Sequence, residues 1–413
     1  MVYSNVCKGV TALVVLGLSA ATANAQDLSL DELRQQIERI SAENQELQEK
    51  VDSIAPEMDA DGISLGGAVR WQYVWTDYGE GNKDRGGDID FDIFRLDLDG
   101  KMGDVILSAQ YRWFEYMEAL RHAYAGYNFG EDWQAQVGIV IQPFGVMPYN
   151  SHNYFFSSNF YIGLEDNNGA GVRFTKRSDD WDLDFAYILN DELGGADGAV
   201  RNKTARYNYD VTGIRLPGEG VYDAPTQLAA ENNTLMVRAA RKWDLGEDRM
   251  FELGGSLQAG DFHDGMNSVG DRRNYGIHAV YQTGPWEFHG QFATYDYDLD
   301  MANEGVIVAA YGYQDTIASS ADSYTANVAY SKPVSIGPIT NLTFYNNYSQ
   351  ITNKTGYEED TVMNVLGVAV TSGGLYTYVD LVTAKNQPFI GGTMVGESDS
   401  YNTRFNINFG YYF

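Results

Sequence analysis

The sequence is poor in cysteine, proline and basic residues, and each of these shortages excludes some classes of protein. The 413 residues include one cysteine and nine prolines, and 28 basic side chains stand against 57 acidic ones. A single cysteine cannot build a disulfide framework. A net charge of −29 leaves no basic surface to neutralise phosphates, so we expect no nucleic-acid partner. Few prolines, 44 glycines and many aromatic residues favour numerous strands over helices.

Motifs for catalysis and metal binding are also missing. The sequence contains no G-x-S-x-G, H-E-x-x-H or phosphate-binding glycine motif. Its five histidines lie far apart, without the spacing of metal ligands. The stretch Asp296–Asp300 begins like a calcium loop, but Met301 replaces the required glycine. We therefore expect no enzyme activity, cofactor or metal site, and treat the acidic stretch Asp84–Asp92 as at most a weak cation site.

Residues 1–25 have the features of a secretory signal peptide. Lys8 provides a positive charge, residues 10–18 form a short apolar core, and Ala23-Asn24-Ala25 fits a cleavage site. The apolar run is too short to cross a membrane as a helix. Cys7 precedes this run, so we expect export without a lipid anchor and a mature chain free of cysteine.

Residues 27–55 carry a heptad pattern that predicts a periplasmic α-helical coiled coil. Apolar side chains alternate at spacings of three and four residues, at Leu30, Leu33, Ile37, Ile40, Leu47, Val51 and Ile54. Asn44 occupies one position of the seam, where an amide fixes register at some cost in stability. We expect self-association into a homotrimer, with a dimer, or a single helix lying on another surface, as the alternatives.

The segment at residues 399–413 alternates between bulky apolar side chains and polar ones. Tyr401, Phe405, Ile407, Phe409, Tyr411 and Phe413 share one face of a strand, opposite Arg404 and three asparagines. This pattern is typical of transmembrane β-barrels, in which lipid-facing and lumen-facing residues alternate. The segment resembles the C-terminal signal of bacterial outer-membrane barrels. We therefore expect the barrel assembly machinery to recognise Phe409, Tyr411 and Phe413.

Similar segments recur through residues 62–413 and predict an all-β transmembrane barrel of sixteen antiparallel strands. Fourteen or eighteen strands stay open, because residues 306–313 could form a further strand. Short connections rich in Gly, Asp and Pro alternate with long ones, near 76–88, 143–168, 190–232, 262–272, 296–321, 349–360 and 385–398. Sixteen strands enclose an aqueous lumen, so the sequence predicts an open pore in the outer membrane of a Gram-negative bacterium.

The alternation places arginines on the lumen face, at Arg70, Arg95, Arg112, Arg121, Arg173, Arg238 and Arg404. Five of them come from the first six strands and predict a basic wall. The aromatic loop at 143–168 contains Tyr149, Tyr154, Phe156 and Tyr161 and ends in Glu165 and Asp166. Such an apolar loop is expected to fold inward, which would set its acidic groups across a constriction from the arginines. Alternatively, the arginines pair with nearby acidic residues or lie at the headgroup rim.

Five acidic residues are also candidates for the lumen face and would shift ion preference towards cations. They are Asp97, Asp99, Asp182, Asp184 and Glu287.

The segment from Trp133 to Gly145, followed by an aromatic loop and residues 169–174, resembles the phosphate-selective porin O/P family and related trimeric porins. The matching positions are Gly138, Pro143, Phe144 and Gly145. The resemblance implies a trimeric sixteen-stranded channel that lies in outer-membrane lipid and passes small hydrophilic solutes or ions by diffusion. Phosphate selectivity does not carry over with the resemblance, because basic residues are outnumbered by acidic ones, and a phosphate-selective porin is kept as an alternative only.

Three alternatives to a general porin stay open at the level of sequence. Aromatic residues of the loop, including Phe155 and Phe160, could stack on sugars in a sugar-selective porin. The coiled coil could instead tether the outer membrane to periplasmic components. An enzyme or adhesin is disfavoured, because no catalytic constellation and no large outer domain is present.

Overall fold

The computed structural model describes residues 61–413, which form one closed barrel and its loops. The predicted signal peptide at 1–25, the coiled coil at 27–55 and Asn44 lie outside these residues. The barrel strands are β1 (Gly62–Thr76), β2 (Asp88–Met102), β3 (Val105–Trp113), β4 (Glu118–Phe129), β5 (Trp133–Ile141), β6 (Asn168–Arg177), β7 (Trp181–Asn190), β10 (Ala230–Asp244), β11 (Arg249–His263), β12 (Ser268–Thr283), β13 (Trp286–Leu299), β16 (Ser320–Ile336), β17 (Ile339–Thr352), β18 (Thr361–Ser372), β19 (Leu375–Lys385) and β20 (Asn402–Tyr412).

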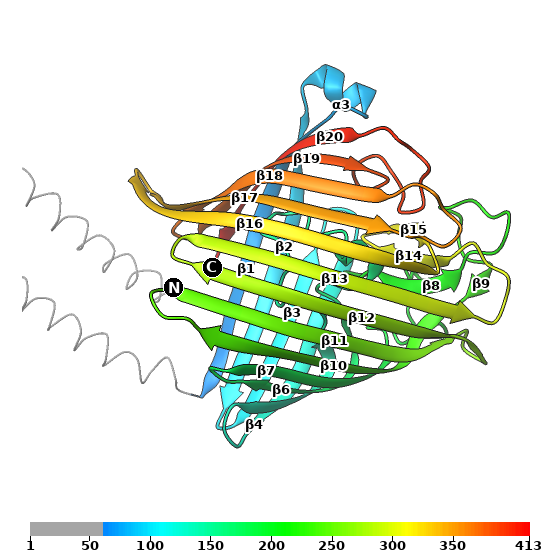
Figure 1. Ribbon diagram of the computed structural model, residues 1–413, viewed down its shortest axis with the longest axis horizontal. Coiled ribbons are helices and arrows are strands. Elements are labelled where there is room, and N and C mark those ends of the chain that lie inside the picture. Colours follow the sequence, from blue (N-terminus) through cyan, green and yellow to red (C-terminus); the bar gives the residue numbers. More distant parts are fainter. Residues whose placement is uncertain (1–60) are drawn as a thin grey trace, which may run out of the picture. The chain divides into compact units, whose positions relative to one another are not determined.

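These sixteen strands pair antiparallel in sequence order, and β1 pairs with β20 to close the ring (Figure 1). The predicted strand count is therefore confirmed. The stretch that could have been a further barrel strand forms β14 (Val306–Ala310), which pairs instead with β8 (Asp210–Ile214) and β15 (Tyr313–Ile317). Together with β9 (Gln227–Leu228), these strands make a four-stranded sheet from two long loops.

Seven tight connections lie at one end of the barrel and the long loops lie at the other, as Figure 1 shows. The prediction of a long connection at 262–272 is wrong, because β11 and β12 extend into this range and leave only residues 264–267 between them. The longer loops contain a helical turn, α3 (Glu80–Arg85), and a short 3-10 helix, η1 (Phe160–Ile162). No helix within residues 61–413 has the length and apolar character needed to cross a membrane.

The outer surface is apolar and the inner surface is polar, as the alternation predicts. On β13, Trp286 and Phe288 are exposed on the outside, whereas Gln291 is buried inside. Near the tight turns, outward aromatic side chains form stacked pairs, including Phe129 with Trp133 and Trp243 with Phe251. Such rings are the aromatic girdle expected at a membrane interface. In the same outer layer, Trp71 stacks on Phe409 across the β1–β20 seam.

Candidate functional site: a constriction inside the barrel

The loop between β5 and β6, residues 142–167, folds into the lumen and is called the constriction loop below. It is bonded along its length to the inner wall formed by β11, β16, β17 and β19. The hydrogen bonds run from Gly145 N to Ser256 Oγ (2.9 Å), Asn150 Nδ2 to Thr325 Oγ1 (2.8 Å), Ser158 N to Ser349 Oγ (3.0 Å) and Tyr154 N to Asp380 Oδ2 (3.3 Å). The loop therefore fills one side of the lumen and leaves the opposite side open.

A cavity of about 470 Å³ lies on that open side, between the loop and strands β1–β3 and β20. Its barrel side carries four arginines, Arg70, Arg95, Arg112 and Arg404. The rest of the lining is dominated by rings, from Phe91, Phe114, Tyr116, Tyr149, Tyr154, Phe155, Phe156, Phe160, Tyr161, Tyr207, Tyr311, Tyr378, Phe389 and Tyr412. The cavity thus sets guanidinium groups across from aromatic rings.

Two of the four arginines are neutralised by neighbouring carboxylates. Arg70 Nε lies 2.8 Å from Asp92 Oδ2, and Arg95 Nη2 lies 2.7 Å from Asp97 Oδ2. Asp97 was expected to favour cations, but Arg95 balances its charge in this ion pair.

Arg112 and Arg404 form no ion pair within residues 61–413. Arg112 donates to Gln110 Oε1 at 2.8 Å, and Arg404 donates to Asn406 Oδ1 at 2.9 Å. Their guanidinium carbons lie 4.3 Å from the ring centre of Tyr207 and 5.0 Å from that of Phe155, respectively. Four guanidinium groups against two carboxylates leave two positive charges at the cavity wall.

Two of the predicted wall arginines lie elsewhere in the lumen. Arg121 is buried and pairs with Asp166, which also accepts a hydrogen bond of 2.6 Å from the Tyr207 hydroxyl. Arg173 Nε donates to Asp184 Oδ1 at 3.0 Å, between β6 and β7. The prediction of one wall holding all five arginines is therefore wrong: three of them meet, and Arg404 joins them through closure of the barrel.

The two acidic residues predicted to face that wall do not line the cavity. Glu165 is 4% exposed and accepts hydrogen bonds from Asn150 N (2.9 Å) and Ser157 N (3.1 Å) inside the constriction loop. Burial raises the pKa of Glu165, and the hydrogen bonds from Ser157 partly oppose the shift. Glu165 thus holds the loop in shape, and Asp166 pairs with Arg121 of β4 outside the cavity, so the surface that faces the arginines of the cavity is aromatic.

All four aromatic residues predicted for the constriction do line the cavity: Tyr149, Tyr154, Phe156 and Tyr161. Phe156 stacks on Phe160 with 4.4 Å between ring centres, and the Tyr154 hydroxyl donates to Asp92 at 3.0 Å. Sequence reasoning missed Tyr207 and Tyr311, which come from the β7–β10 and β13–β16 loops. No local pattern marks them, because only the packing of distant loops brings them to the cavity.

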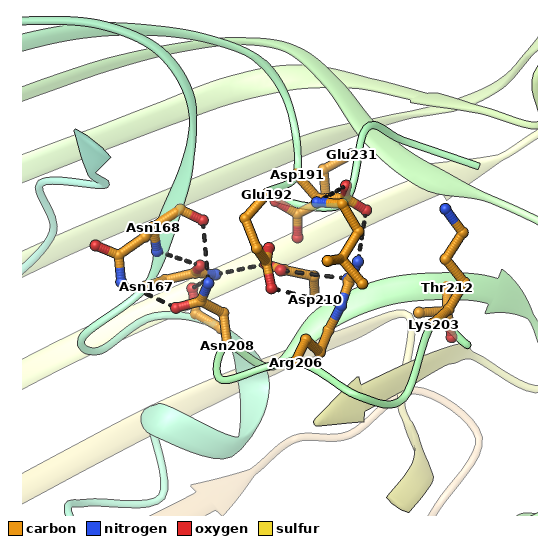
Figure 2. Close-up of polar contacts among 12 residues, drawn as sticks. Asn167, Asn168, Asp191, Glu192, Lys203, Arg206, Asn208, Asp210, Thr212 and Glu231 are labelled. Atoms are coloured by element: carbon orange, nitrogen blue, oxygen red, sulfur yellow. Dashed lines mark hydrogen bonds and ion pairs between the residues drawn. The ribbon is translucent and has the colours of Figure 1, made fainter. Parts of the chain in front are cut away.

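A buried polar cluster holds the β7–β10 loop beside the constriction loop (Figure 2). Arg206, fully buried, lies 2.9 Å from Asp191 and 3.3 Å from Asp210. Asp210 also accepts a hydrogen bond of 2.9 Å from Asn167, at the end of the constriction loop. Burial raises the pKa of Asp210 well above its usual range, and the neighbouring Glu192 raises it further. The cluster thus connects Tyr207 and its loop to the constriction.

Two histidines that are distant in the sequence meet in the lumen. His152 of the constriction loop and His289 of β13 both approach Glu287, with Nε2 to Oε1 distances of 2.9 and 2.6 Å. Their separation along the sequence gave no sign of this pair, because only the inward fold of the loop brings the two side chains together. Glu287 therefore does not stand alone as a cation-attracting carboxylate.

The chain matches no family model and no curated protein sequence. Its fold does match solved structures of outer-membrane porins and channels. These include Salmonella typhi OmpF in complex with daunomycin (11% identity, TM-score 0.54, 86% of this chain and 98% of that chain) and an anion-selective porin from Comamonas acidovorans (13%, 0.52, 86% and 100%). The outer membrane channel DcaP of Acinetobacter baumannii is similar to the same degree (12%, 0.51, 86% and 98%). The chain therefore shares the fold of these porins and channels.

Proposed function

We propose that this protein is a porin of the outer membrane of a Gram-negative bacterium, and that small hydrophilic solutes cross it by passive diffusion. The apolar outer surface, the aromatic girdle and the polar lumen suit a barrel that spans lipid. The single observation that carries the proposal is the cavity between the arginine wall and the constriction loop. The loop narrows the lumen, and the cavity is the space that it leaves open. The fold shared with known porins supports the same function.

At the constriction, the proposed preference is for small organic anions. Arg112 and Arg404 leave two positive charges without carboxylate partners at the wall. The rings opposite offer a stacking surface for an apolar or planar part of the solute. The negative charge of the whole chain acts against this preference, but charges beyond about 10 Å are largely screened at 0.1 M salt. Groups that line the constriction therefore dominate selection.

Conductance in a planar lipid bilayer tests the proposal. We expect water-filled channels that open without an energy source, and a reversal potential across a potassium chloride gradient that reports anion preference. A protein that inserts but never conducts would exclude a porin. A cation-directed reversal potential would retain the pore and reject the anion preference, and a block by neutral oligosaccharides would favour a sugar-selective channel.

The proposed assembly is a homotrimer in outer-membrane lipid, delivered there by the barrel assembly machinery through the segment ending in Phe409, Tyr411 and Phe413. Phe409 and Tyr411 face outward on β20, which is the orientation that such a signal on the lipid face requires. The relation to the phosphate-selective porin O/P family stays part of this proposal. It rests on the element Gly138, Pro143, Phe144 and Gly145 at the start of the constriction loop.

A further inference from the structure

The ligand atoms of His152, Glu287 and His289 lie within 4.8 Å of one another, and no other such group of three occurs in the described barrel. The two imidazole rings have centres 4.9 Å apart. Both rings direct Nε2 at the same carboxylate oxygen, Glu287 Oε1. Three donor atoms therefore converge on one point from two separate segments of the chain.

The local structure explains why these three side chains meet. Glu287 and His289 are two residues apart on β13, so both point into the lumen. The backbone N–H of His152 donates to Asn347 Oδ1 at 3.0 Å, which fixes this residue of the constriction loop against β17. Gln282 Nε2 donates to Glu287 Oε2 at 2.8 Å and leaves Oε1 to the histidines. Hydrogen bonds to the barrel strands β17 and β12 thus hold His152 and Glu287 in place.

Two imidazole nitrogens and one carboxylate oxygen are a ligand set that Zn²⁺ takes up, with water in the fourth position. The Glu287 side chain is 32% exposed, so water reaches the site. His289 Nδ1 has no hydrogen-bond partner within residues 61–413, whereas its Nε2 lies 2.6 Å from Glu287 Oε1, which places the ring proton on Nε2 as long as no metal is bound. Moving the proton from Nε2 to Nδ1 leaves a neutral imidazole and frees Nε2 to bind a metal.

We propose that His152, Glu287 and His289 bind one divalent transition-metal ion, of which Zn²⁺ fits the ligand set best, and that the ion ties the constriction loop to β13. None of the three residues lines the cavity beside the arginine wall. The metal site and the cavity are therefore distinct places in the lumen, so the proposals of metal binding and of a pore can fail separately.

The tautomer of His152 affects how tightly the site can bind a metal ion. Its Nδ1 lies 3.2 Å from Asn347 Nδ2, a donor, which favours the tautomer with the proton on Nε2. Metal binding needs the opposite tautomer, and a carboxylate beside Nδ1 would favour it. Asn347→Asp is therefore expected to tighten metal binding, since its oxygens can accept from both Nδ1 and the backbone N–H of His152.

The test is calorimetric titration of ZnCl₂ into chelator-treated protein folded in detergent. We expect one Zn²⁺ per chain, affinity at least about 100-fold weaker in His289→Ala and His152→Ala, and tighter binding in Asn347→Asp. His263→Ala is the matched control, because His263 lies at the outer end of β11, outside this group, and its removal should change nothing. Co²⁺ should give the absorption spectrum of a site with nitrogen ligands in the parent protein, His263→Ala and Asn347→Asp, but not in His289→Ala or His152→Ala.

Absence of binding in the folded parent protein would overturn the proposal. So would equal affinity in the parent protein and His289→Ala, or equal or weaker affinity in Asn347→Asp. Folding of each variant is checked by the heat-dependent shift in gel mobility. Bilayer conductance of the same samples is measured in parallel, so that loss of metal binding and loss of pore function are told apart.

Discussion

The guanidinium of Arg112 lies over the ring of Tyr207, with 4.3 Å from its central carbon to the ring centre. Arg112 belongs to barrel strand β3, and Tyr207 belongs to the loop between β7 and β10. The contact holds a cation at the cavity wall without a carboxylate to neutralise it. A cation held by a ring keeps most of its attraction for a passing anion, which an ion pair would largely cancel.

Replacing Arg112 and Arg404 together by glutamine should shift ion selectivity towards cations. A unit charge about 4 Å from an ion contributes about 1 kcal/mol in water, so loss of both charges removes about 2 kcal/mol and should lower the chloride-to-potassium permeability ratio roughly 30-fold. Reversal potentials across a salt gradient measure this ratio. Arg241→Gln is the matched control, because Arg241 stacks on Trp181 and Trp243 on the outer surface. An equal shift in the control would contradict the assignment of selectivity to the cavity.

Gly145→Ala should loosen the start of the constriction loop. Gly145 has φ of +62°, and a Cβ there would stand 2.6 Å from the Cδ of Gln291, whose Oε1 accepts a hydrogen bond from Val146 N. The backbone conformation alone costs about 1 kcal/mol for a residue other than glycine. We expect noisier single-channel currents and larger conductance, with Gly290→Ala as control, since a Cβ at Gly290 meets nothing within 4 Å. Unchanged currents would show that the loop tolerates the displacement.

The loops joined by Asp315 and Met394 should be more stable against unfolding at pH 4 than at pH 7. Burial raises the pKa of Asp315 to about 6 from an ordinary value of 3.8, although Thr393 and the Met394 amide, which donate to its carboxylate, oppose the shift. The folded loops therefore bind this proton more tightly than the unfolded chain does. The resulting stabilisation is complete below about pH 4 and disappears as the pH rises through 6. The difference of about two pKa units corresponds to at most about 3 kcal/mol.

Hydrogen exchange at the Met394 amide, corrected for the intrinsic rate, measures this effect. Protection should fall by up to about 100-fold between pH 4 and 7. Lys354, whose pKa burial lowers to about 8, keeps its charge through most of this range and adds little to the slope. Asp315→Asn should make protection independent of pH, and a slope that survives this substitution would assign the proton to another group.

Deleting residues 27–60 should leave a barrel that inserts and conducts but assembles less stably. If the predicted coiled coil with Asn44 in its seam holds three chains together, conductance steps should change from groups of three to single units. Native mass spectrometry in detergent measures the assembly directly. An unchanged trimer would place the contacts between barrels. Loss of envelope integrity with intact conductance would instead favour a tethering role for this segment.

The strand pattern of the barrel was predictable from the sequence because the lumen and the lipid impose a period of two on every strand. The same period placed Arg70, Arg95 and Arg112 on the inner face. It could not predict their partners, since those depend on register between strands and on loops. Glu165 shows the limit: the acidic end of an inward loop can point to solvent or back into the loop, and only the packing around Ser157 decides.

The meeting of His152 with His289 was beyond sequence reasoning for the same physical reason. Spacing along one strand relates Glu287 to His289, but the position of the constriction loop against β13 depends on many weak contacts spread over several strands. Conversely, the stretch 306–313 was a candidate strand, and residues 306–310 do form β14, but β14 pairs with β8 and β15 and not with the barrel. Local pattern thus predicts the conformation of a segment better than it predicts the segment's neighbours.

Reciprocal hydrogen bonds between Gly67 and Phe413, of 2.8 and 3.1 Å, join the opposite ends of the barrel sequence. Contacts so distant along the chain form slowly, because chain entropy is lost before they bring any gain. Until β20 meets β1, both strands present unpaired edges that can join other chains. Closure of the barrel therefore competes kinetically with aggregation. Before closure, the exposed edges of β1 and β20 must be kept from pairing with other chains until the protein reaches the membrane.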